Sequence, residues 1–168
     1  MKNLKLYTSI LSILFLTCCD KNSGGMDPCD NCHTNIFKCK INGVDWKPDC
    51  IPDPLFGCNT FMIQYYPLDK FFEISGDNPY NKLGLHFVVR NVETGMKLPI
   101  EYDYAVYADY SKKASCISYQ LDTTNINCFI IESNNESKRI VKGKFSFSCF
   151  NNCLDTVGIT DGIFDLSY

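Results

Sequence analysis

The feature that most constrains the fold is a series of short apolar segments that begins at Asn35 and is broken by turn residues about every eight to twelve positions. In segment 82–91, Leu83, Leu85, Phe87 and Val89 alternate with the other side chains, which is the period of a β-strand. No stretch keeps the 3.6-residue period of an amphipathic helix over about three turns. The segments expected to form strands are 36–41, 44–47, 60–66, 71–75, 82–91, 102–107, 115–120, 126–132, 139–149, 156–160 and 163–168.

The connections between these segments have the length of hairpin loops, which predicts an all-β antiparallel fold of about ten strands over residues 35–168. We expect a β-sandwich rather than a barrel, because roughly 130 residues suit a core between two packed sheets. Two dipeptides, Asn42-Gly43 and Asp161-Gly162, are typical of tight turns, since these residue types tolerate positive φ. In segment 139–149 the alternation predicts that Val141, Gly143, Phe145, Phe147 and Cys149 face inward.

The N-terminus has the pattern of an export signal. Lys2 and Lys5 make a positive start, and Leu6 to Leu16 form an apolar run as long as the h-region of a signal peptide. The run is too short for a membrane-spanning helix, which needs roughly 20 apolar residues. A lipoprotein signal peptide is therefore predicted over residues 1–18. The alternative is an ordinary secretory signal.

The sequence Leu16-Thr17-Cys18-Cys19 resembles the lipobox of bacterial lipoproteins, in which the final Cys is acylated. Acylation of Cys19 places Leu16 at position −3, whereas acylation of Cys18 would place Phe15 there. We therefore expect Cys19 to carry the acyl chains, which bind membranes by about 0.8 kcal/mol per buried methylene. The expected location is the cell envelope, as an outer-membrane lipoprotein that faces either the periplasm or the outside.

Residues 19–34 are expected to form a flexible tether, because they contain Gly24-Gly25, Pro28 and few apolar side chains. Removal of residues 1–18 takes away two lysines and leaves 14 basic against 19 acidic residues, a net charge of −5. An acidic chain has no electrostatic attraction for phosphate-rich surfaces. Nucleic acid is therefore not an expected partner, and the membrane is reached through the lipid anchor.

Nine cysteines remain after Cys18 and Cys19, and export favours disulfides among them. An odd number leaves at least one of them without an intramolecular partner. Two pairings can be argued locally. Cys116 and Cys128 are expected to face each other across a hairpin around Asp122, and Cys149 and Cys153 flank a turn short enough to bridge. Around a proline-rich loop, the cysteines that could form a staple are Cys39, Cys50 and Cys58.

Residues 29–33 read Cys-Asp-Asn-Cys-His, which fits the attachment pattern of c-type haem. In that reading Cys29 and Cys32 form thioethers and His33 is an axial ligand. The sixth ligand would be one of His86, Met26, Met62 and Met96. The pattern lies in a polar tether rather than an apolar pocket, so a disulfide from Cys29 or Cys32 is favoured over haem or a metal, and no cofactor is expected.

Catalysis has little support in the sequence. Gly-x-Ser-x-Gly, phosphate-loop, dinucleotide and zinc-helix motifs are absent, and His86 is the only histidine after the tether. Calcium or sugar could be bound by Asp77-Asn78, Asp155, Asp161 and Asp165, although turns are rich in such residues for conformational reasons.

We therefore expect a non-catalytic binding module for a protein or glycan ligand, with electron transfer through haem as the alternative. Tyrosines give large contact area with a polar tip, and those near expected turns are Tyr65, Tyr66, Tyr80 and the tyrosines within 102–110.

Three segments carry a family resemblance. Phe37 to Pro48 resembles the Phe-x-Cys-x-Val-Asn-Gly-x-x-Trp-x-Pro opening of an uncharacterised Bacteroidetes-type family of small lipoproteins, and Ile159 to Tyr168 resembles its C-terminal Ile-Thr-Asp-Gly-x-Phe-Asp ending. Gly143 to Phe147 resembles its Gly-x-Phe-x-Phe strand. The resemblance implies a lipid-anchored all-β domain and no activity. Within it, Trp46, Phe164 and Tyr168 are expected to pack in the core or at its edge.

Overall fold

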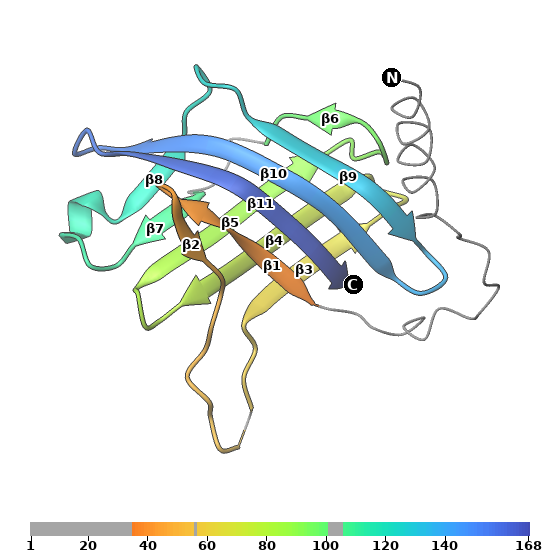
Figure 1. The fold of residues 1–168 in the computed structure, drawn as a ribbon, viewed down its shortest axis with the longest axis horizontal. Coiled ribbons are helices and arrows are strands. Elements are labelled where there is room, and N and C mark those ends of the chain that lie inside the picture. The colour runs from red at the N-terminus through yellow and green to blue at the C-terminus, as the bar shows by residue number, and fades with distance from the viewer. Residues whose placement is uncertain (1–34, 56, 101–105) are drawn as a thin grey trace, which may run out of the picture. The chain divides into compact units, whose positions relative to one another are not determined.

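The computed structural model describes residues 35–55, 57–100 and 106–168, and in these ranges the chain is built almost entirely of β-strands (Figure 1). The described residues contain eleven strands and one 3-10 turn, η1 (Ala114–Cys116). The strands are β1 (Ile36–Ile41), β2 (Val44–Trp46), β3 (Phe61–Tyr66), β4 (Phe71–Asn78), β5 (Leu83–Arg90), β6 (Lys97–Leu98), β7 (Tyr107–Asp109), β8 (Ser118–Leu121), β9 (Cys128–Asn135), β10 (Ile140–Asn151) and β11 (Thr156–Ser167). The all-β prediction is confirmed. The expected signal peptide and tether lie outside the described residues.

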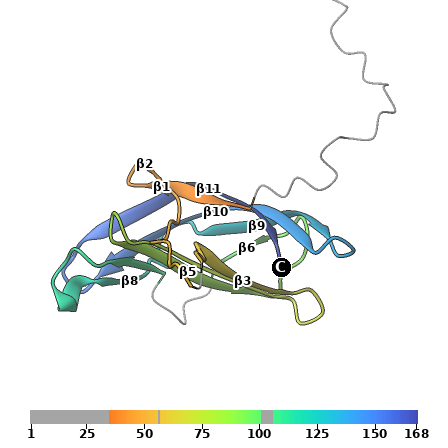
Figure 2. The same cartoon turned by 90° about the horizontal axis from the view of Figure 1, so that it is seen from below.

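All eleven strands form one open antiparallel sheet that folds over on itself. The strand order is β2-β1-β11-β10-β8-β7-β5-β4-β3. β9 pairs with a different stretch of β10, and β6 pairs with β9. Figure 2 shows the two resulting layers, the first made of β1, β2, β9, β10 and β11 and the second of β3, β4 and β5. β10 connects them, because Ile140–Ser146 pairs with β9 whereas Cys149–Asn151 pairs with β8. The expected sandwich is thus formed by two halves of one sheet.

Phenylalanine rings from both layers fill the space between them. The ring centroid of Phe72 in β4 lies 4.9 Å from that of Phe129 in β9 and 5.0 Å from that of Phe164 in β11. Phe87 in β5 lies 5.0 Å from Phe145 in β10. All five rings are at most 2% exposed, and such ring pairs stabilise by about 0.5–1.5 kcal/mol beyond their burial. The inward face predicted for segment 139–149 is confirmed, and in segment 82–91 three of the four alternating apolar residues, Leu85, Phe87 and Val89, are buried in the core.

The prediction of a turn at Asp161-Gly162 is wrong, because β11 runs through this dipeptide without a break. The register between β1 and β11 shifts here, so that one residue of β1 faces two residues of β11 in a β-bulge. Asp161 has the positive φ that its residue type predicts, at 52°, but it lies in a β-bulge rather than in a turn. The turn at Asn42-Gly43 is confirmed, with φ values of 50° and 81°.

Several strand boundaries differ from those expected. β9 begins at Cys128 because the preceding residues form a turn in which the carboxylate of Asp122 accepts hydrogen bonds from the N–H and hydroxyl of Thr124. These hydrogen bonds also lower the pKa of Asp122. The short strand β6 was not expected. Of the expected strand 102–107, residues 102–105 lie outside the described ranges, and β7 begins at Tyr107.

Candidate ligand-binding face

The cysteines form two disulfides within the described residues, Cys50–Cys58 and Cys116–Cys153. The staple predicted across the proline-rich loop is confirmed for Cys50 and Cys58. The predicted pairs Cys116–Cys128 and Cys149–Cys153 are both wrong. Free thiols in this part of the chain belong to Cys39, Cys128 and Cys149.

The wrong pairings have a topological cause. β8 and β9 do not form a hairpin, because each pairs with a different end of β10, and therefore Cys116 does not face Cys128. Cys149 faces the core, where its thiol donates a hydrogen bond to the carbonyl of Val157 at 3.7 Å. Cys153 lies in the turn after β10 and bonds to Cys116 across the junction of the two layers.

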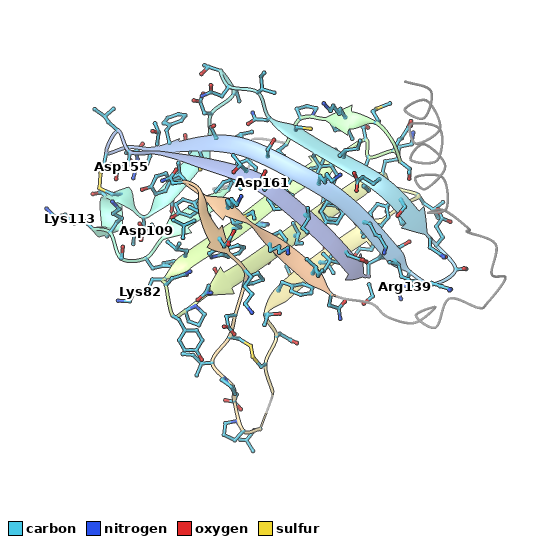
Figure 3. All side chains as sticks on the ribbon, viewed as in Figure 1. Lys82, Asp109, Lys113, Arg139, Asp155 and Asp161 are labelled. Carbon is cyan, nitrogen blue, oxygen red and sulfur yellow. A yellow bond between two sulfur atoms is a disulfide. The ribbon has the colours of Figure 1, made fainter. Side chains whose placement is uncertain are left out.

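A buried amide organises this junction. Asn151 is 3% exposed, and its Nδ2 donates to the carbonyl of Cys116 at 2.8 Å. Its Oδ1 accepts the backbone N–H groups of Cys153 at 2.9 Å and Asp155 at 3.0 Å. We call the set Cys116, Asn151, Cys153 and Asp155 the layer junction. Figure 3 shows Asp155 at the same end of the sandwich as Asp109 and Lys113.

A groove of about 710 Å³ lies between the loop after β2 and the strands β3 and β4. Asp49, Cys50 and Ile51 line one side, and the Cys50–Cys58 disulfide closes the loop that carries them. The backbone N–H of Asp49 donates to the carbonyl of Asp77 at 2.9 Å, which attaches the loop to the end of β4. The groove therefore has a wall that is covalently closed and hydrogen-bonded to the sheet.

A second hollow of about 340 Å³ lies over β4, β5 and β7. It shares Met62, Ser75 and Asp77 with the groove, so the two hollows form one surface, which we call the concave face. Gly84 in β5 keeps this surface open. A Cβ at Gly84 would lie 2.2 Å from Oδ1 of Asp77 and 3.5 Å from the ring of Tyr110. The missing side chain thus leaves room for the Asp77 carboxylate and the Tyr110 ring over β5.

The concave face is acidic. Among the described residues, its lining includes the carboxylates of Asp49, Glu73 and Asp77 and contains no lysine or arginine. Nε2 of His86 lies 2.9 Å from Oε1 of Glu73, a contact that orients the imidazole. Asp77 forms no ion pair within the described ranges. Burial, and next the charge of Asp77, raise the pKa of Tyr110. The face thus offers carboxylate acceptors and a half-exposed aromatic ring.

The outer face of the first layer has a different character. Three lysines of this face are paired with carboxylates across neighbouring strands, with N···O distances of 2.8 Å for Lys40–Asp161, 2.7 Å for Lys142–Asp165 and 2.5 Å for Lys144–Glu132. Such exposed pairs contribute about 0–1 kcal/mol each and are typical of a solvated surface. A hollow of about 460 Å³ also lies on this layer, between β1, β2 and the bulge at Asp161. Because its lysines stand beside Asp45 and Asp161, it carries no strong net charge.

The expected tyrosines divide between core and surface. Tyr65 and Tyr107 are buried, with 6% and 4% exposure, and belong to the core. Tyr66, Tyr80 and Tyr110 are 50%, 66% and 54% exposed. Of these three, Tyr110 lines the concave face. Trp46, Phe164 and Tyr168 pack in the core or against it, as expected.

The acidic candidates divide in the same way. Asp77 lies on the concave face, whereas Asp155, Asp161 and Asp165 each pair with a lysine elsewhere. In the described ranges, no group of three or more His, Cys, Asp or Glu side chains is placed to hold a metal ion. Cys19, Cys29, Cys32 and His33 lie outside these ranges.

Sequence reasoning missed Gly84 and the pairing of His86 with Glu73. A glycine inside an otherwise regular strand marks a close approach of another group, and this signal could have identified Gly84. The His86–Glu73 contact depends on the register of β4 and β5, which the sequence does not state.

In the parts of the chain that the structure describes, no helix is long and apolar enough to cross a membrane. Comparisons with protein-family models, curated proteins and solved structures find no match for this chain, so the lipoprotein-family resemblance stays a prediction.

Proposed function

We propose that this chain is a lipid-anchored binding module of the cell envelope, acylated at Cys19, without catalytic activity, and that the concave face binds its ligand. The observation that carries the proposal is the contrast between the outer faces. On the first layer, lysines neutralise the carboxylates of Glu132, Asp161 and Asp165, whereas among the described residues no lysine or arginine accompanies the carboxylates that line the hollowed surface of the second layer. An ion-paired surface suits solvent, and a concave surface with convergent polar groups suits a ligand.

The chemistry of the face favours a glycan over a protein surface. Carboxylates of Asp77 and Glu73 accept hydrogen bonds from hydroxyl groups, Ser75 both donates and accepts, and the Tyr110 ring offers an apolar contact for a sugar face. The groove is open rather than enclosed, so a chain of sugar units could continue beyond it. A protein ligand is the second outcome that the experiment must distinguish.

The test is a glycan array, with a parallel array of envelope and surface proteins, probed with the full chain in detergent. We expect glycan binding that weakens about tenfold in Asp77→Asn and in Tyr110→Ala, since each loses one hydrogen bond or ring contact. Lys144→Ala on the opposite face is the matched control and should bind as the unaltered chain does. Equal binding by all four proteins, or binding on neither array, would overturn the proposed face.

The anchor is tested separately by detergent-phase partitioning. Cys19→Ala should move the protein from the detergent phase to the aqueous phase, because the acyl chains supply the membrane affinity. Cys18→Ala should remain in the detergent phase. Release by Cys18→Ala instead, or retention of both variants, would refute acylation at Cys19.

The rival function, electron transfer through haem at Cys29, Cys32 and His33, has a direct spectroscopic test. Covalent haem would give an intense Soret absorption in the exported protein that survives extraction with acidified acetone. We expect no such band. Its presence would replace the binding-module proposal.

A further inference from the structure

Strand β3 ends the sheet with an unprotected edge. It pairs with β4 in unbroken register from Phe61↔Gly76 to Tyr66↔Phe71, and none of the other described strands is its neighbour (Figure 1). Across the described residues, no other segment forms a backbone hydrogen bond with its outward edge. The strand reads Phe-Met-Ile-Gln-Tyr-Tyr, without a charge, a proline or a bulge. An edge of this kind is a template for another strand.

The two short edge strands of the described sheet are protected by their length, by charge or by proline. β2 is three residues long, contains Asp45 and is followed by Pro48 within two residues. β6 is two residues long, and it covers part of β9. Short strands, charges and prolines are the usual means of blocking edge-to-edge pairing. Pro67 directly follows β3, but the six residues of β3 itself contain no charge and no proline, so the edge from Phe61 to Tyr66 stays open to pairing.

We propose that two copies of this chain pair antiparallel through β3, with Gln64 of both copies on the two-fold axis. This register keeps the outward and inward sides of the two strands aligned, which antiparallel pairing requires. It places Met62 opposite the partner's Tyr66, two side chains that are 49% and 50% exposed in the single chain. It also places Ile63 opposite the partner's Tyr65, and cross-strand pairs of aromatic and branched or flexible apolar side chains stabilise antiparallel ladders.

Charge supports self-pairing. Because β3 contains no ionisable group other than tyrosine, two copies meet without like-charge repulsion. The central Gln64 side chains can donate and accept amide hydrogen bonds with each other across the axis. The second layers of the two copies would then join in one continuous sheet.

The same register brings an exposed aromatic side chain to the groove. The partner's Tyr66, which is 50% exposed in the single chain, lies opposite Met62. Met62 lines the groove beside the disulfide-closed loop. Each copy would thus offer Tyr66 to the mouth of the other copy's groove, so the pairing is reciprocal, as a two-fold interface demands.

The test measures the number of chains per particle for the full chain in detergent, by light scattering corrected for bound detergent. Unaltered protein should contain two chains. Gln64→Lys and Gln64→Glu should each weaken pairing about 100-fold and give single chains, because like charges would meet on the axis. An equimolar mixture of these two variants should restore two chains per particle, which excludes misfolding as the cause.

Val44→Lys is the matched control, because Val44 is 70% exposed on β2 at the opposite edge of the sheet. This variant should keep two chains per particle. The proposal is overturned if unaltered protein is a single chain at about 100 µM, which lies well above the dissociation constant of a stable pair. Two chains in Gln64→Lys, single chains in Val44→Lys, or a Lys and Glu mixture that stays single would also overturn it.

Discussion

The two disulfides of the described chain hold different kinds of structure. Cys116–Cys153 spans 37 residues and joins η1 to the turn between β10 and β11, where the sheet passes from one layer to the other. Cys50–Cys58 spans 8 residues and closes a loop that projects from the sandwich, as Figure 1 shows. The first links segments that folding must bring together, whereas the second shapes a segment whose ends are already close.

This difference predicts that one disulfide contributes mainly to the stability of the fold and the other mainly to the shape of the binding face. A cross-link over a long segment removes more freedom from the unfolded chain, and the layer junction also contains the buried Asn151 that binds both linked segments. A cross-link over a short loop removes less conformational freedom from the unfolded chain. This loop, however, forms one wall of the groove, and Asp49 attaches that wall to β4. We therefore expect one disulfide to hold the fold and the other to hold the concave face.

The largest effect should follow loss of the long-range disulfide. The double variant Cys116→Ser/Cys153→Ser should lower the free energy of unfolding by about 4 kcal/mol, from loop entropy for the 37-residue span. Urea denaturation at neutral pH measures the change. Cys128→Ser, which alters a cysteine that forms no disulfide, is the control and should change stability by less than about 0.5 kcal/mol. A loss smaller than that caused by removing Cys50–Cys58 would contradict the division between the two disulfides.

A smaller and more local effect should follow loss of the short-range disulfide. The variant Cys50→Ser/Cys58→Ser should cost no more than about 2.5 kcal/mol, because its span is 8 residues. Hydrogen exchange should become faster at Asp49, whose N–H binds Asp77, while exchange in β10 and β11 stays slow. Faster exchange spread evenly over both layers would show that this disulfide supports the fold rather than the groove.

The contrast also explains how far sequence could predict this molecule. Alternation is a local property, so the strands, the shared face of alternating residues in β5 and the inward face of β10 were predicted well. The Cys50–Cys58 staple was also local, since both residues flank one proline-rich loop. The Cys116–Cys153 bond was missed because it depends on β8 and β9 both pairing with β10, and no local pattern specifies that arrangement.

Sequence patterns predict the candidate site only in part, for the same reason. Asp77 and Asp161 look alike in sequence, as acidic residues in turn-like dipeptides. Lys40 in β1 neutralises Asp161, whereas the cross-strand neighbour of Asp77 is Gly84, which leaves the carboxylate open to the concave face. The neighbour across the sheet decides the role of each carboxylate, and that neighbour is set by register rather than by the residue itself.

The last prediction concerns the thiols that stay outside both disulfides. Burial raises the pKa of Cys39 and of Cys149 to about 12. Although Cys149 is close to Cys153 in sequence, a protonated thiol does not attack a disulfide, so the Cys116–Cys153 bond is protected from exchange near neutral pH. The unfolded chain, with thiol pKa values near 9, loses protons that the folded chain keeps between pH 9 and 12. Stability from these groups is therefore fully present below pH 9 and falls as the pH rises.

At pH 9.5 the loss should be about 1 kcal/mol per thiol relative to pH 7.5, measured as the fall in the urea-unfolding free energy. The variant Cys39→Ala/Cys149→Ala should be less stable at both pH values, because it loses buried packing, but its stability should decline less between them. Cys128→Ala is the control and should retain the decline, because this variant keeps both buried thiols, Cys39 and Cys149. An identical decline in all three proteins would show that Cys39 and Cys149 ionise as easily in the folded chain as in the unfolded one. In that case the buried thiols could not be what preserves the pairing of Cys116 with Cys153.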